Sequence, residues 1–147
     1  MAKEYDARMH TAEHVLNATM VSLLGSGRSF SSHINPGKSK CDYRFPRDIT
    51  EAEATELTAR INAALGANLP VTEEAMPRDE AATRFNLTRL PADAGDTLRI
   101  IRVGDYDACP CIGTHVPNTS EVGRFVLVSH SWADDVLRLR FKLEAAH

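Results

Sequence analysis

The segment VLRLRFKL, residues 136–143, alternates apolar and basic side chains without interruption. A period of two is typical of a β-strand with one buried face and one solvated face. We expect one set of side chains to face the core (Leu137, Leu139, Phe141 and Leu143) and the other to face outward (Arg138, Arg140 and Lys142). The segment therefore predicts a sheet that has a hydrophobic inner face and a basic outer face.

Further segments that lead up to this strand show strand patterns. Residues 29–45, SFSSHINPGKSKCDYRF, predict two short strands around an NPG turn, and three other segments read as single strands (LPVTEEAM at 69–76, TLRIIRVG at 97–104 and RFVLVSH at 124–130). We expect residues 105–123 to be mostly loop, with a short strand through IGTHV at 112–116.

Helical periodicity appears between these strands. Apolar residues recur at helical spacing over about 7–24 and 51–65, and RDEAATRF at 78–85 predicts a shorter helix behind Pro77. Thr50 and Glu53 form the sequence pattern of a capping box before the second helix. Helices interspersed with strands that often follow one another directly predict an α+β two-layer sandwich, in which a mainly antiparallel sheet is covered by helices.

Length and composition set the class of protein. The chain has 147 residues, which predicts one domain with a core over about residues 8–143, and it is 43% hydrophobic and 25% charged. No apolar run approaches the roughly 20 residues that span a bilayer. The first ten residues lack the profile of a signal peptide, so we expect a cytoplasmic protein with no membrane partner. The net charge of −3 does not indicate a nucleic-acid binder, although charge can be segregated onto one face.

Two pairs of metal-type ligands stand about a hundred positions apart. In MHTAEHVL, residues 9–16, His10 and His14 are four apart, which on a helix lets two imidazoles share one cation. In CPCIGTH, residues 109–115, Cys111 and His115 are also four apart, in a segment rich in turn residues. Three nitrogens and one sulfur are a full set of zinc-type donors, so we predict one zinc site from these four residues.

Other interpretations of the same residues stay open at this point. HTAEH also fits the H-x-x-E-H pattern of zinc proteases, in which Glu13 would activate the water. Against a protease, a chain of this length has little room for a peptide cleft, and the Cys/His segment offers better zinc ligands than a carboxylate. Cys111 with His115 could instead form a nucleophilic Cys–His pair, and Cys109 is an alternative zinc ligand.

The two motifs together resemble a known family. HTAEHVL followed by CIGTHVPNTSEVG is similar to the H-x-x-x-H and C-x-x-x-H pair of the editing domain shared by alanyl-tRNA synthetase and threonyl-tRNA synthetase, which also occurs free-standing as the AlaX proteins. KSKCDYRF, EAEATELTARINAAL and VLRLRFKL follow in the family's order. The resemblance covers about residues 8–143.

The resemblance implies an activity. It implies hydrolysis of the ester that joins a wrong amino acid to the tRNA 3′ end, with alanine tRNA carrying serine or glycine as the expected substrate and serine-charged threonine tRNA as the alternative. His10, His14, Cys111 and His115 match the family's metal or catalytic positions. They would hold zinc and a water molecule that attacks the ester. A zinc-stabilised module that binds tRNA or a synthetase without hydrolysis is a further alternative.

This chain departs from the family pattern beside the second pair. Ile112 stands where a glycine is usual, which adds bulk near the pocket, and Cys109 adds a further sulfur. We predict that Ile112 and three small polar residues contact the substrate (Thr11, Ser32 and Thr114). Two basic groups are predicted to contact tRNA phosphates (Arg138, Arg140 and Lys142, and Lys38, Lys40 and Arg44).

Overall fold

The computed structural model describes residues 7–35, 37–85, 87, 95–111 and 113–144. The elements follow the order α1 (Ala7–Leu24), β1 (Ser31–His33), β2 (Ser39–Arg44), α2 (Glu51–Gly66), β3 (Val71–Pro77), α3 (Arg78–Arg84), β4 (Thr97–Val103), β5 (Asp107–Pro110), a 3-10 turn (Thr119–Glu121), β6 (Arg124–Ala133) and β7 (Val136–Glu144). Within this described part, none of the helices combines the length and hydropathy needed to span a bilayer.

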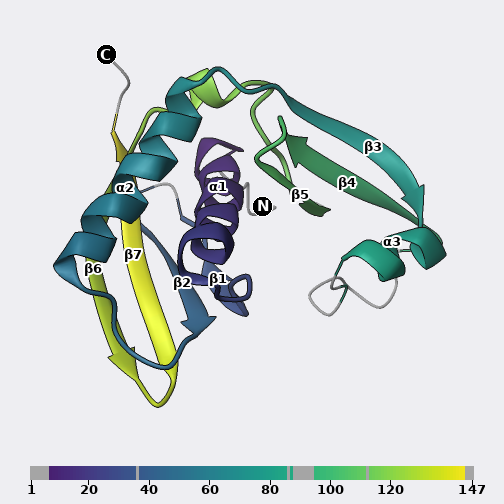
Figure 1. The fold of residues 1–147 in the computed structure, drawn as a ribbon. Coiled ribbons are helices and arrows are strands. Elements are labelled where there is room, and N and C mark those ends of the chain that lie inside the picture. The colour runs from purple at the N-terminus through teal and green to yellow at the C-terminus, as the bar shows by residue number, and fades with distance from the viewer. Residues whose placement is uncertain (1–6, 36, 86, 88–94, 112, 145–147) are drawn as a thin grey trace.

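The strands form two antiparallel sheets instead of one. The larger sheet has the order β1-β2-β7-β6, and the smaller one has the order β3-β4-β5. Figure 1 shows α1 at the centre, with the larger sheet on one side and the smaller sheet on the other. The predicted α+β class with antiparallel sheets and covering helices is confirmed, and the division into two sheets is the feature that the sequence patterns did not reveal.

The main hydrophobic core lies between the larger sheet and the two long helices. The inward residues of β7 that the alternation predicted, Leu137, Leu139 and Phe141, are fully buried. They pack in one cluster with the apolar side of α1 and with residues of α2. A second, smaller cluster lies under α3 on the smaller sheet and includes Met76, Leu98 and Ile100. The smaller sheet therefore has a second cluster of its own, while one end of it, at Val103 and Val71, packs in the main core.

The capping box of α2 is confirmed. The Thr50 hydroxyl accepts from the Glu53 backbone N–H at 3.1 Å, and the Glu53 carboxylate accepts from the Thr50 N–H at 2.9 Å. We expect Thr50→Ala to lower the free energy of unfolding by about 1 kcal/mol, because one amide donor at the helix start loses its partner. Urea unfolding measures this change. Thr55→Ala, on the exposed side of the same helix, is the control and should leave the midpoint unchanged or raise it slightly.

One predicted element is wrong. The chain was expected to be loop through residues 105–111 with a short strand at 112–116, but the strand is β5 at Asp107–Pro110, and residues 113–116 have no strand structure. β5 pairs with β4, with Cys109 opposite Ile101 and Pro110 opposite Ile100. Proline is tolerated there because β5 is an edge strand. Pairing with a strongly apolar neighbour outweighs the low strand propensity of this segment.

Candidate metal and active site

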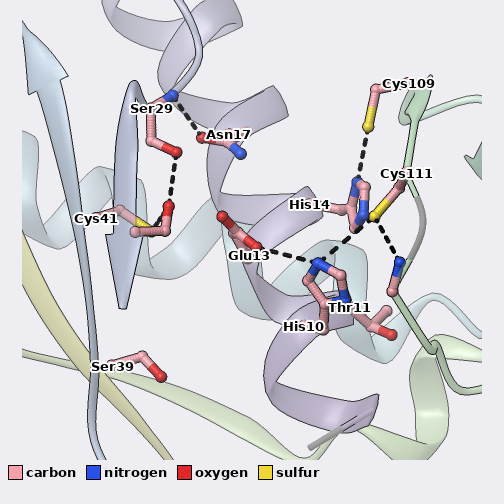
Figure 2. A network of polar contacts seen from close by, with 12 residues as sticks. His10, Thr11, Glu13, His14, Asn17, Ser29, Ser39, Cys41, Cys109 and Cys111 are labelled. Carbon is pink, nitrogen blue, oxygen red and sulfur yellow. Dashed lines mark hydrogen bonds and ion pairs between the residues drawn. The ribbon is translucent and has the colours of Figure 1, made fainter. Parts of the chain in front are cut away.

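The two histidines of the first motif lie on the buried part of α1. His10 and His14 are 9% and 4% exposed, and their ring centroids are 5.4 Å apart. Residues four apart on a helix lie one above the other, so both rings leave the same side of α1. Figure 2 shows that this side faces the segment that carries Cys109 and Cys111, and the Cys109 sulfur on β5 lies 3.1 Å from Nδ1 of His14.

The segment that follows β5 brings the second pair to this side of α1. The Cys111 sulfur lies 3.5 Å from Nε2 of His10, and the His115 ring centroid lies 4.6 Å from the centroids of both helix histidines. One ligand atom from each of the four predicted residues lies within 4.8 Å of the other three. Figure 2 shows Cys111 approaching the histidines from the strand side. The structure therefore brings together the four residues that the sequence predicted as ligands.

The donor set fits a zinc ion. Ligands at about 2.0–2.3 Å from a tetrahedral zinc are about 3.3–3.8 Å from one another. The 3.5 Å between the Cys111 sulfur and Nε2 of His10 falls in this range, and the other ligand atoms lie within 4.8 Å of one another. Nε2 of His14 and both ring nitrogens of His115 are buried and have no hydrogen-bond partner among the described residues. Buried polar atoms are normally satisfied, so these nitrogens indicate that a ligand belongs in the cluster.

The histidines favour the thiolate form of Cys111. Burial alone would raise the pKa of this thiol, but His10, His115 and His14 around the sulfur lower it from 9.0 to about 3. A thiolate is the form of cysteine that binds metals and acts as a nucleophile. The sulfur is therefore prepared to serve as a ligand at neutral pH.

Behind His14 lies a buried ion pair. Asp107 accepts two hydrogen bonds from the Arg28 guanidinium, at 2.7 and 3.1 Å, and its Oδ2 lies 3.2 Å from Nδ1 of His14. Burial opposes ionisation of Asp107, but His14 and Arg28 outweigh it and lower the pKa of this carboxyl. An ionised carboxylate only accepts, so Nδ1 of His14 donates to Asp107. Burial lowers the pKa of His14, but Asp107, Cys109 and Cys111 outweigh it and hold this pKa well above the ordinary 6.5. Binding of a metal would displace the proton from Nε2, the nitrogen that faces the cluster.

Cys109 belongs to this second group and not to the four-residue cluster. Its sulfur lies 3.1 Å from Nδ1 of His14 and 3.4 Å from the Arg28 guanidinium. Nδ1 is the nitrogen that faces Asp107, so Cys109 sits behind the His14 ring. The structure thus separates the two sulfurs of the CPC segment: Cys111 joins the cluster, and Cys109 contacts the far side of one of its ligands.

Two features fix the segment that carries Cys111 and His115. Arg99 on β4 donates to the carbonyl of Gly113 at 2.7 Å, and the Cys111 N–H donates to the Arg99 carbonyl at 3.1 Å. Gly113 also packs directly on a histidine ring: a Cβ added there would lie 1.9 Å from Cε1 of His10. Glycine is therefore required at this position for steric reasons.

The structure gives the predicted substrate residues different environments. Thr11 is fully buried, Ser32 is partly buried on β1, and Thr114 is exposed. The Ser32 hydroxyl bonds to the hydroxyl of Ser29 at 3.0 Å and donates to the Cys41 sulfur. Ile112 lies outside the described residues. Contact of these four residues with a substrate stays a prediction.

Thr11 links α1 to the segment that bears His115. Its hydroxyl donates to the Ala7 carbonyl at 2.7 Å and accepts from the buried Val116 N–H at 3.2 Å. We expect Thr11→Val to cost about 1–3 kcal/mol of unfolding free energy, because that N–H loses its acceptor, whereas Thr11→Ser keeps the bond and most of the stability. Thermal unfolding compares the two variants. Wild-type stability in Thr11→Val together with a raised KM would instead assign the hydroxyl to substrate binding.

The two predicted basic groups come together on the outer face of the larger sheet. Lys40 pairs with Arg140 across β2 and β7, and Asp42 pairs with Arg138. Arg138 is neutralised by bonds of 2.8 and 2.9 Å to Asp42, and the Arg44 guanidinium lies 3.9 Å from the centre of the Phe30 ring. Neighbouring residues Cys41 and Leu139 point into the core with α1, so this basic face points away from the His/Cys cluster.

A shallow groove borders the cluster at His115. It runs along β3 and β4 and is lined by Val71, Thr72, Glu73, Arg99, Ile101, His115, Val116 and Pro117. Within it, Glu73 accepts from Arg99 at 2.6 Å. A molecule bound at the cluster would have room to extend along this groove, across the smaller sheet.

Asp107 and Arg28, which contact the cluster through His14, were not identified from the sequence. Asp107, Cys109 and Cys111 are spaced two apart, as on one face of a strand, and this spacing was the available signal for β5. The turn residues of the same segment led us to expect a loop instead. Arg28 follows the GSG segment at 25–27 and no local pattern marks it as the partner of Asp107.

Comparison with known proteins finds one family match and several relatives of similar sequence. Residues 98–139 match the family described as the threonyl and alanyl tRNA synthetase second additional domain. The chain is 32% identical to the alanine–tRNA ligase of Treponema denticola over 143 residues, which cover 96% of this chain and 24% of the relative. It is 33% identical to the enzyme of Fervidobacterium nodosum over 125 residues, which cover 84% of the chain and 14% of the relative.

These matches confirm the resemblance that the motifs predicted: residues 98–139 match the second additional domain, and similarity to alanine–tRNA ligases extends over nearly the whole chain. The chain spans about a quarter or less of the length of the curated relatives it matches. The similarity therefore concerns one region of these ligases.

Proposed function

We propose that this protein hydrolyses the aminoacyl ester of mischarged tRNA, with serine- or glycine-charged alanine tRNA as substrate. The observation that carries the proposal is the convergence of His10, His14, Cys111 and His115 within 4.8 Å from segments about a hundred residues apart. The similarity to alanine–tRNA ligases supports a tRNA substrate and favours the alanine system.

The residues of the site have distinct parts in this reaction. His10, His14, Cys111 and His115 would hold zinc, which as a Lewis acid polarises an ester carbonyl and lowers the pKa of water. Asp107 fixes the tautomer of His14. The groove beside His115 would receive the 3′-terminal nucleotide and so align the ester with the cluster.

The basic face of the larger sheet would contact the body of the tRNA. Because this face points away from the cluster, its phosphate contacts would be distant in the tRNA from the 3′ end. Lys40 and Arg140, which face each other across the strands, are the residues we expect to contribute most, whereas Arg138 already has a carboxylate partner. Binding through these residues should weaken as salt concentration rises.

The test is deacylation of defined substrates by the zinc-loaded protein. Alanine tRNA charged with serine or glycine should be hydrolysed, and the same tRNA charged with alanine should persist. Serine-charged threonine tRNA measures the choice of tRNA. Failure to hydrolyse any mischarged tRNA would refute the proposal, and tight tRNA binding without hydrolysis would assign the protein to the class of tRNA-binding modules.

A further inference from the structure

Glu13 is a buried carboxylate beside the cluster, and the proposed reaction so far gives it no part. It lies on α1 one turn from His10, is 7% exposed, and its Oε1 is 3.4 Å from Nε2 of His10. In Figure 2 the Glu13 side chain reaches the same ring nitrogen that Cys111 approaches. The carboxylate therefore borders the space enclosed by the four predicted ligands.

The other carboxylates near the cluster already have cationic partners. Asp107 is held by Arg28 at 2.7 Å, and Glu73 is held by Arg99 at 2.6 Å. Among the described residues, the partner within ion-pair distance of Glu13 is His10. The 3.4 Å between Glu13 Oε1 and His10 Nε2 is longer than a good hydrogen bond. A buried carboxylate is costly unless a cation or several donors satisfy it, so Glu13 can still accept a cationic ligand.

An aminoacyl ester brings such a cation. A free α-amino group has a pKa of about 8, which an ester lowers toward neutrality, and a neighbouring carboxylate favours its protonated form. Its nitrogen lies about 2.5 Å from the carbonyl carbon, since only Cα separates them. A carbonyl placed at the cluster would therefore put the ammonium within reach of the Glu13 carboxylate, which borders the same space. The side chains of His10 and Glu13 keep 11% and 10% exposure, so a small ligand can approach both.

We propose that Glu13 binds the α-ammonium of the substrate and so restricts the site to esters with a free α-amino group. This inference rests on the proposed function and narrows its substrate class: aminoacyl-tRNA is accepted, whereas tRNA that carries an N-acylated amino acid or a peptide is rejected. An acyl group removes the charge from the nitrogen and adds bulk beside a buried carboxylate.

The experiment compares seryl-tRNA with N-acetyl-seryl-tRNA prepared from the same alanine tRNA. We expect wild-type protein to prefer the free amine by about 10- to 100-fold in kcat/KM, the range for a hydrogen bond to a charged group. Glu13→Gln keeps the shape but not the charge, and it should bring the ratio close to one by slowing the free-amine substrate alone. Glu56→Gln, on exposed α2, is the control and should keep the wild-type ratio.

These kinetics and one further measurement, the binding of an analogue that cannot be hydrolysed, separate the outcomes. If Glu13→Gln slows both substrates equally, or if wild-type protein does not distinguish them, Glu13 has another part, such as accepting a proton from water, and the inference is overturned. If wild-type protein hydrolyses neither substrate, the proposed function fails, and binding still decides the inference. Adenosine that carries serine through a 3′-amide should bind wild type at least about tenfold more tightly than its N-acetyl form, and Glu13→Gln should abolish that difference.

Discussion

Gly113→Ala is expected to disrupt the proposed zinc site while the rest of the fold persists. The added Cβ would lie 1.9 Å from Cε1 and 2.2 Å from Nδ1 of His10, so the ring must leave its position. Displacement of one ligand should weaken zinc binding by more than the roughly 10- to 100-fold typical of changes to groups that only support a ligand. Deacylation should fall at least in proportion. Competition with a chromophoric chelator measures the zinc affinity.

Gly27→Ala is the matched control. Gly27 has no atom within 4 Å of an added Cβ, and its backbone does not require a positive φ, so alanine should be tolerated. Zinc affinity in Gly113→Ala that stays within about twofold of the control would show that His10 is not a ligand. Far-UV circular dichroism should be the same for both variants, because α1 and the larger sheet do not depend on this contact.

Asp107→Asn is expected to have the second largest effect. The substitution leaves the Arg28 guanidinium without its anion and allows an amide donor to face Nδ1 of His14, which favours the wrong tautomer. Zinc affinity should fall by about 10- to 100-fold. The unfolding free energy should fall by about 2 kcal/mol, below the roughly 3–5 of fully buried pairs, because Arg28 keeps 34% side-chain exposure. Zinc titration and urea unfolding measure the two effects.

The same pair gives the zinc-free protein a defined pH dependence. The pKa of Asp107 is lower in the folded state than the ordinary 3.8, so its contribution is fully present above about pH 4 and is lost as pH falls through the folded pKa. Asp107→Asn should therefore lose less stability than wild type between pH 5 and about pH 2. Equal acid sensitivity of the two proteins would indicate that Asp107 is not ionised in the fold.

The parts of the fold that could be predicted are those in which a local pattern agrees with the tertiary contacts. The capping box of α2 and the inward face of β7 each combine a clear local pattern with burial. α1 also has the predicted bounds, although nearly every residue from Met9 to Met20 is buried. The clustering of the four predicted ligand residues could be anticipated because each pair keeps a spacing of four. β5 could not be predicted because its strand structure comes from its pairing with β4. The contact between Arg28 and Asp107 spans 79 residues, and no local pattern encodes such a distance.

The division of the molecule into two hydrophobic cores has a consequence for folding. His10 and His14 belong to a helix that packs in the main core, whereas Cys111 follows a strand of the sheet that carries the smaller one. A ligand held by all four side chains bridges these two units. Binding of this ligand would stabilise the state in which both units are folded and in contact. The smaller sheet has the smaller hydrophobic cluster, so its local unfolding should be suppressed most. The proposed metal site would therefore also stabilise the contact between α1 and the smaller sheet, which packs in the main core only at one end.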